Sequence, residues 1–318
     1  MSTYIIYRLI QAIFVAFIVS ILVFLAMRLL PGDPIYMIMT ADQAQSVSPE
    51  KIEQIRHEYG LDKSLPAQYI DWIGGVVTGN LGMSIMRAEP VIDMIGRRLP
   101  VTMYLGILSV IVATVLGVLA GVICAVRRAT WIDTLVTLVS YFGLTVPVFW
   151  LGYVLIYFIG LKFGWLPLHG FTSPFENPGM HIKQLIMPVF CLSVFSVAAN
   201  ARQTRSSMLE VLHQDYIRTA WSKGLSERII IIKHALKNAL IPVVTLIGMQ
   251  LRYVIGGAVL VETIFAINGI GTLVVNSVIN RDYPVVQGVI LLIALLIILV
   301  NLVIDISYGW LDPRIRYE

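Results

Sequence analysis

The residues most able to do chemistry form no recognisable catalytic set in this sequence. The five histidines stand far apart, at His57, His169, His181, His213 and His234. None belongs to an HxxxH or HxxE pattern, and Cys124 and Cys191 lie in apolar runs without CxxC spacing. The motifs GxxxxGK[ST], GxSxG and HExxH are absent as well. We therefore expect neither an enzyme nor a chain that itself binds a metal ion, a nucleotide or another cofactor.

One polar segment between apolar runs has a pattern that suits a partner protein, Asp215-Tyr-Ile-Arg-Thr-Ala-Trp-Ser-Lys-Gly-Leu-Ser-Glu-Arg228. Asp215 to Ser222 is typical of a short helix, and Gly224 is typical of its end. A short helix with small residues at Thr219 and Ala220 suits insertion into a groove. A solvated basic loop fits the same pattern, so the residues alone leave both interpretations open.

Three residues in or near apolar runs are candidates for lining a path across the membrane: Arg252, Glu262 and Phe149. An arginine near the bilayer centre costs roughly 3 kcal/mol, so Arg252 must face protein or water. It can line a cavity and attract a carboxylate, or it can pair with an acidic residue of this chain or of a partner. Glu262 can line an external mouth or fasten the loop that follows it. Phe149 can gate the path, although aromatic residues in membrane helices more often pack or anchor.

The composition indicates the solvent in which these residues lie. The chain has 318 residues, of which 58% are hydrophobic and only 13% charged, and its mean hydropathy is +0.82. A soluble domain of this length needs far more charge to cover its surface. The net charge of +4 is modest, and the basic residues lie in short loops next to apolar runs, as lipid headgroups favour. We expect a membrane protein that does not bind nucleic acid.

Six apolar runs are long enough to cross a bilayer, which takes about 20 residues. They are Leu9–Leu30, Thr102–Val126, Ile132–Leu161, Leu185–Ala201, Leu240–Phe265 and Val285–Tyr308. The third run contains Pro147 and is expected to be tilted or kinked. The pattern predicts an all-α polytopic membrane protein with six transmembrane helices.

The basic residues predict the orientation of these helices. With the N-terminus in the cytoplasm, the short outside loops hold only Lys162, Lys183 and Arg281, and most other basic residues lie inside. Both termini are then cytoplasmic. The chain divides into an N-terminal transmembrane helix (1–30), an extracytoplasmic helical segment (31–99) and a core (100–318) with a cytoplasmic loop (202–239). The extracytoplasmic segment is expected to be a small helical cap, with one helix from Ser48 to Gly60 and another from Pro66 to Val77.

The cytoplasmic loop resembles the EAA loop of ABC importer permeases, E-A-A-x3-G-x9-I-x-L-P. Arg218-Thr219-Ala220 stands at E-A-A, and Gly224 matches the glycine. Of the last three positions only Leu236 matches, and Lys237 stands where proline is expected. That departure is typical of the dipeptide and oligopeptide branch of the family.

Further segments resemble the same branch in order along the chain. They are Pro31-Gly-Asp-Pro34, Gly79-Asn-Leu-Gly82 with Ser84, Thr204-Arg-Ser-Ser-Met-Leu-Glu210, Glu262-Thr-Ile-Phe265, Arg281-Asp-Tyr-Pro-Val-Val-Gln287 and Asp312-Pro-Arg-Ile-Arg316. The resemblance spans nearly the whole chain and implies the type I ABC importer permease fold.

The resemblance also implies a division of labour in a bacterial plasma (inner) membrane. This chain would form a heterodimer with a homologous permease, and two ATPase subunits that use ATP and Mg would dock on the cytoplasmic face. An extracytoplasmic solute-binding protein would deliver a di- or oligopeptide. The ATPase-coupling residues would be Asp215, Arg218, Thr219, Ala220, Lys223, Gly224 and Leu225. The cargo stays open, because glutathione or a nickel complex fits the same family, and a secondary transporter without ATPases is the alternative of another class.

Overall fold

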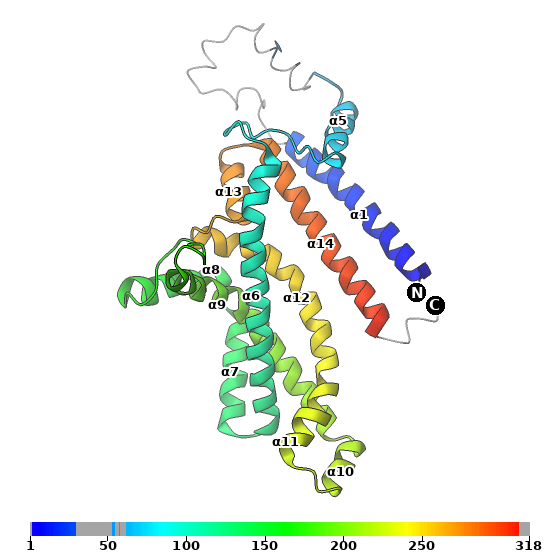
Figure 1. Ribbon diagram of the computed structural model, residues 1–318, viewed down its shortest axis with the longest axis vertical. Coiled ribbons are helices and arrows are strands. Elements are labelled where there is room, and N and C mark those ends of the chain that lie inside the picture. Colours follow the sequence, from blue (N-terminus) through cyan, green and yellow to red (C-terminus); the bar gives the residue numbers. More distant parts are fainter. Residues whose placement is uncertain (1, 30–52, 55–56, 58–61, 312–318) are drawn as a thin grey trace. The chain divides into compact units, whose positions relative to one another are not determined.

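The computed structural model describes residues 2–29, 53–54, 57 and 62–311, and it leaves the side chains of residues 2–4, 252–255 and 307–311 undescribed. The elements follow in the order α1 (Ser2–Arg28), α5 (Leu65–Val77), α6 (Val91–Val126), α7 (Trp131–Thr145), α8 (Val148–Leu155), the π-helical η1 (Ile156–Lys162), α9 (Pro178–Leu212), α10 (Asp215–Ser222), α11 (Glu227–Ile229), the π-helical η2 (Ile230–Ala235), α12 (Leu236–Ile264), α13 (Ile270–Ile279) and α14 (Tyr283–Leu311) (Figure 1). Within these residues the only β pairing is an isolated bridge between Met83 and Pro90. The all-α prediction is confirmed.

The described helices include five that are long and apolar enough to cross a membrane, or six if one bent pair counts as a single span. The pair is Trp131–Thr145 with Val148–Lys162, and the helix direction bends by 107° between them. The break lies at Val146 and Pro147, where Val146 adopts an extended backbone. A proline disfavours helical geometry in the residue before it and cannot donate a backbone hydrogen bond. The predicted kink is therefore a sharp break between two helices.

Several helices continue well beyond the apolar runs that predicted them. The run Leu185–Ala201 is the middle of α9, which has 35 residues, and the run Thr102–Val126 is the end of α6, which has 36. Hydropathy detects only the part of a helix that lies in lipid, whereas the backbone hydrogen bonds continue through polar residues at either end. The short apolar helix α13 was not among the predicted elements.

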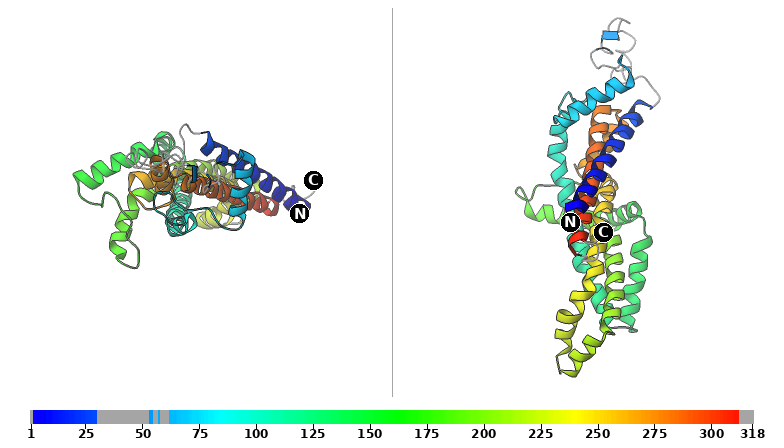
Figure 2. Two further views of the ribbon diagram at one scale, coloured as in Figure 1. Left: turned by 90° about the horizontal axis from the view of Figure 1, so that it is seen from above. Right: turned by 90° about the vertical axis from the view of Figure 1, so that its right-hand side faces the viewer.

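The chain divides into two compact units, and the first comprises Met1–Pro100 with Thr272–Glu318. Within it α1 lies beside α14 (Figures 1 and 2), and Arg8 pairs with Asp305 at 3.0 Å. The predicted helix from Pro66 to Val77 is α5, which packs on α1 through edge contacts between aromatic rings. The predicted helix from Ser48 to Gly60 falls mainly outside the described residues.

The second unit, Val101–Gly271, is organised around α9, which contacts α7, α8 and α12. Two glycines bring α6 close to α9. A Cβ atom at Gly117 would lie 2.6 Å from the Cβ of Asn200, and one at Gly121 would lie 2.5 Å from the carbonyl oxygen of Ala201. Glycine four residues apart on a membrane helix allows such close backbone approach. This tight packing makes α9 the frame on which the candidate sites are built.

Candidate functional site

The predicted short helix from Asp215 to Ser222 is confirmed as α10, directly after the end of α9. Its inward face carries Ile217 and Ala220, which are 0% and 7% exposed. They join a cluster with Ala125 of α6, Met208 of α9, and Ile230, Ala235 and Ala239. Burying these apolar side chains fixes the helix against its own chain. The cluster brings α10 and the end of α6 together at one end of the second unit (Figure 1).

Gly224 ends α10 in a Schellman motif. Its φ of 73° lies in the left-handed region, its N–H donates to the carbonyl oxygen of Trp221 at 2.9 Å, and the N–H of Leu225 donates to that of Ala220 at 3.4 Å. Leu225 then packs at the edge of the same apolar cluster. A glycine adopts this conformation without the strain that a Cβ atom would bring. The glycine is therefore required by the way the helix stops.

The outward face of α10 is polar and strongly exposed. The side chains of Asp215 and Arg218 are 96% and 73% exposed and approach to 3.5 Å, a surface ion pair that contributes little to stability. Thr219 and Lys223 are exposed beside them. A partner could cover this face at little cost in stability, because few of these side chains are needed to hold the helix in place.

Two of the candidate coupling residues face the other way. Ala220 is buried in the apolar cluster and Leu225 is partly buried at its edge. The expectation that Thr219 and Ala220 enter a partner's groove together therefore needs correction for this structure, since Thr219 is exposed and Ala220 packs inside the chain. Adjacent residues on a helix point about 100° apart, which separates the two. Ala220 positions the helix, and Thr219 is available to a partner.

After the turn at Gly224, the chain becomes helical again at Glu227 and continues without a break into the next long helix. Ser226 occupies the N-cap position of α11, and its carbonyl oxygen accepts hydrogen bonds from the N–H groups of Ile229 and Ile230, although its side chain makes no cap bond. The π-helical η2 then leads into α12. A second tie links α10 to this helix, because Asn238 donates a hydrogen bond to the Tyr216 hydroxyl at 2.8 Å. The helix α10 is thus attached to the base of α12.

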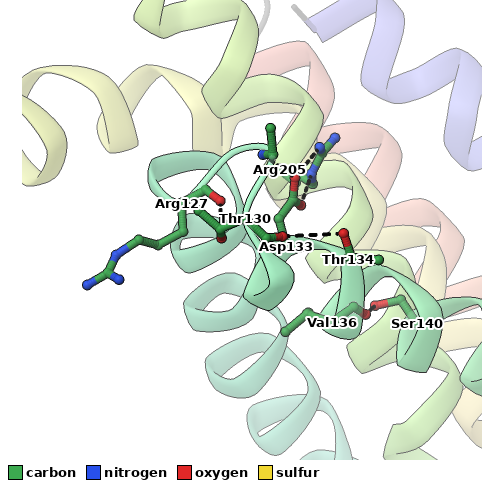
Figure 3. Close-up of polar contacts among 8 residues, drawn as sticks. Arg127, Thr130, Asp133, Thr134, Val136, Ser140 and Arg205 are labelled. Atoms are coloured by element: carbon green, nitrogen blue, oxygen red, sulfur yellow. Dashed lines mark hydrogen bonds and ion pairs between the residues drawn. The ribbon is translucent and has the colours of Figure 1, made fainter.

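A partly buried ion pair fixes the neighbouring turn between α6 and α7. Arg205 of α9 donates from Nε and Nη2 to the two carboxylate oxygens of Asp133 at 2.7 and 2.8 Å (Figure 3). The same carboxylate accepts the N–H of Ala129, whose φ is 60°. Bidentate pairs of this kind hold both position and angle. The sequence interpretation missed it, although a charged Asp133 inside the predicted span Ile132–Leu161 was the signal.

Glu262 lies fully buried near the end of α12. It accepts the Thr102 hydroxyl at 2.5 Å through Oε1 and the N–H of Gly271 at 2.7 Å through Oε2. The Thr102 oxygen in turn accepts the N–H of Ile270 at 2.8 Å. Gly269 packs against the carboxyl group so closely that a Cβ atom there would collide with it. We call Glu262, Thr102, Ile270 and Gly271 the Glu262 network; it fastens the loop between α12 and α13 to α6.

Of the other two candidates for the translocation path, only Phe149 has a described side chain. Phe149 lies on α8 with 49% of its surface exposed, whereas Glu262 is 0% exposed. Arg252 is part of α12, but its side chain lies outside the described part of the structure. The described residues thus give these candidates no shared lining.

In the first unit, two of the quoted sequence segments are partners. Ser84 donates to the buried carboxylate of Asp282 at 2.5 Å, and the N–H of Ile85 donates to the other carboxylate oxygen at 3.1 Å. Gly82 approaches Pro284 of the second segment. The segments Gly79–Ser84 and Arg281–Gln287 therefore form one structural clamp. Sequence spacing could not reveal this pairing, because nearly two hundred positions separate them.

Among the described residues, no three His, Cys, Asp or Glu side chains gather in a geometry that could hold a metal ion.

Comparison with known proteins finds two related families, which match different parts of the chain. Residues 117–317 match the family described as binding-protein-dependent transport system inner membrane component, and residues 1–106 match the one described as binding-protein-dependent transport system membrane component, N-terminal. Over 317 residues the chain is 43% identical to a probable peptide ABC transporter permease protein of Sinorhizobium fredii, with 100% of both covered. It is 42% identical over 318 residues to the glutathione transport system permease protein of Escherichia coli, again with 100% of both covered.

Another relative is the di/tripeptide transport system permease protein of Pseudomonas aeruginosa, 41% identical over 320 residues and 94% of each chain. Among solved structures, a chain of the MetNI methionine ABC transporter in inward-facing conformations matches with a TM-score of 0.56 and 19% identity, over 69% of this chain and 96% of that one. At this identity the match concerns the fold alone, and it confirms the predicted fold class.

Proposed function

The chain belongs to the family of binding-protein-dependent transport system inner membrane components, and from that premise we propose that it is the permease subunit of an ATP-driven importer of di- and oligopeptides. The family consists of membrane transport components rather than enzymes, so ATP hydrolysis belongs to separate subunits. Curated relatives named for peptide transport support the peptide cargo.

The observation that carries the proposal is the form of α10. Its inward face is apolar and buried, its outward face is polar and exposed, and its end is fixed by the left-handed Gly224. A short helix held this way offers a preformed surface to a partner, which lowers the entropy cost of association. We assign the partner as one of two ATPase subunits, which use ATP and Mg, on the cytoplasmic face. The excess of Lys and Arg near α10 supports the orientation with both termini in the cytoplasm.

The attachment of α10 suggests how closure of the ATPases would be transmitted to the membrane helices. From Glu227 to Ile264 the chain is helical throughout, through α11, η2 and α12, a length of roughly 55 Å at about 1.5 Å per residue. The Glu262 network lies near its far end and holds the next loop. When the ATPases close, α10 and α12 would move as one rigid piece and alter access to the path between this chain and a homologous second permease. An extracytoplasmic binding protein would deliver the solute.

The test is ATP-dependent uptake in proteoliposomes that contain this chain together with its partner permease, ATPase and binding-protein subunits. We expect uptake of a labelled dipeptide that requires ATP on the ATPase side and the loaded binding protein. The control is the chain alone under a proton or sodium gradient. Uptake by the chain alone, driven by the ion gradient, would contradict the proposal and identify a secondary transporter.

A second cargo has an observation in its favour. A relative of nearly the same identity is named for glutathione transport. Glutathione is itself a tripeptide with an unusual γ-linkage, so the same assay with glutathione as competitor separates the two cargoes. Strong inhibition of dipeptide uptake by an equal concentration of glutathione would favour this second function.

A further inference from the structure

A small cavity opens between α7 and α9 and is not used by the proposed coupling mechanism. It has a volume of about 80 Å³, and its lining includes Ser140 and Tyr141 of α7 and Arg202 and Arg205 of α9. A single water needs only ~10–15 Å³ measured in this way. The cavity therefore has room for a compact polar group of several heavy atoms.

The donors around this cavity carry an excess of positive charge. Arg205 uses Nε and Nη2 to bind Asp133, so that pair is neutral as a whole. Arg202 has no ion pair or hydrogen bond from its side chain to any other described residue. Arg202, Arg205 and Tyr141 all line the cavity, and their side chains include the donors available to a bound group. A phosphate monoanion matches such a set of donors in both charge and hydrogen bonding.

The position of the cavity along the helices matches the edge of a bilayer. The helices α7 and α9 run antiparallel, because Asp133 pairs with Arg205 while Gly143 approaches Ala198. Ser140 therefore lies about 10 Å along α7 from the ion pair beside the α6–α7 turn. Trp131, the first residue of α7 beside that turn, is 74% exposed. Exposed Trp and Tyr at the end of a membrane helix mark the headgroup level.

The surface beside the cavity is apolar. Leu135, Leu138, Val139 and Phe142 of α7 are each more than half exposed, as expected for side chains that face lipid. A ligand that fits both features has an anionic phosphate at one end and hydrocarbon at the other. Free phosphate would use only the basic cavity. An acidic protein segment would leave the exposed apolar side chains of α7 without a matching partner.

We propose that this cavity binds the phosphate headgroup of an anionic phospholipid through Arg202 and Arg205, with the acyl chains along the exposed face of α7. The lipid lies in the leaflet reached by the α6–α7 turn, which is the cytoplasmic leaflet in the orientation proposed above. The phospholipid would hold α7 and α9 together next to α10. The binding itself does not depend on the peptide cargo or on the ATPase partner.

The experiment is native mass spectrometry of the purified full-length chain in detergent, titrated with phosphatidylglycerol or with phosphatidylcholine of the same acyl chains. We expect the chain to bind phosphatidylglycerol about tenfold more tightly than phosphatidylcholine. Arg202→Gln should reduce that affinity about tenfold, as loss of a charge-assisted phosphate contact does. Ser140→Met, which fills the cavity without changing charge, should also weaken it. Arg128→Gln is the matched control, because Arg128 is an exposed arginine on the adjacent turn.

Five results would overturn the proposal. The first three are equal affinity for the two lipids, an equal loss in Arg202→Gln and Arg128→Gln, and unchanged affinity in both Arg202→Gln and Ser140→Met. Displacement of the lipid from the wild-type chain by millimolar inorganic phosphate would instead assign the cavity to soluble phosphate. Release of the lipid when the second permease subunit binds would assign the α7 face to a protein partner. The wild-type titration needs no variant, so failure of a variant to fold leaves the proposal testable.

Discussion

The helix α10 and the Glu262 network lie in the same compact unit, and both contain charged residues beside apolar runs. Their charged groups differ in burial and in hydrogen bonding. The carboxylate of Glu262 is fully buried and meets donors at both oxygens, whereas Asp215 and Arg218 of α10 are exposed and contact mainly each other. A buried acceptor with fixed donors cannot be altered without cost. An exposed face can change freely unless a partner covers it. Charged residues beside apolar runs therefore include buried groups that hold the fold and exposed groups that a partner could contact. Burial distinguishes the two kinds.

The largest effect is expected from Glu262→Gln. The amide keeps the shape but turns one acceptor into a donor that faces either the Thr102 hydroxyl or the N–H of Gly271. Losing a hydrogen bond to a buried carboxylate costs roughly 2–3 kcal/mol, so the melting temperature of the detergent-purified chain should fall clearly. Glu227→Gln is the control, because Glu227 is exposed. Equal melting temperatures for the two variants would remove the distinction between the two regions.

A smaller, local effect is expected from Gly224→Val. A Cβ atom there would meet nothing within 4 Å, so the main penalty expected is the left-handed backbone at φ 73°. That penalty is roughly 1–2 kcal/mol for most residues and less for asparagine. ATP-driven uptake in proteoliposomes should drop about tenfold in Gly224→Val and stay near wild type in Gly224→Asn. Both variant proteins should be present at the same level as the wild type. If valine and asparagine abolish uptake equally, the partner must need the bare glycine surface instead.

The smallest effect is expected from Tyr216→Phe, which removes the hydrogen bond from Asn238. A single hydrogen bond contributes roughly 0.5–1.5 kcal/mol, and this one is exposed to solvent. Backbone amides of α10 should therefore exchange with deuterium about two- to tenfold faster, while those of α9 stay unchanged. Tyr153→Phe, at an exposed tyrosine of α8, should alter neither helix. Unchanged exchange in α10 would mean that the apolar cluster alone holds the helix.

Much of this arrangement was predictable from local sequence. The helix Asp215–Ser222 and its end at Gly224 follow from helix and turn preferences. The break between α7 and α8 follows from the chemistry of Pro147. The pairings of Asp133 with Arg205 and of Ser84 with Asp282 could not be predicted, because they join residues far apart in sequence. The inward direction of Ala220 was missed for a related reason. Which face of a short helix is buried depends on the neighbouring helices, and eight residues of mixed polarity do not specify them.

The central claim, that the outward face of α10 contacts an ATPase subunit, is tested most directly by thiol labelling at two adjacent positions. The native Cys124 and Cys191 are buried, so background labelling should be low. In the isolated chain, a maleimide should label Thr219→Cys quickly and Ala220→Cys slowly, because the first side chain is exposed and the second is 7% exposed. Glu176→Cys, in the exposed loop before α9, serves as the reference.

When the ATPase subunits assemble with the chain, labelling of Thr219→Cys should fall at least tenfold, and a short crosslinker at this position should capture an ATPase subunit. Labelling of Glu176→Cys should stay the same. If the ATPases bind and hydrolyse ATP while Thr219→Cys remains as reactive as in the isolated chain, α10 is a solvated loop and the account is contradicted.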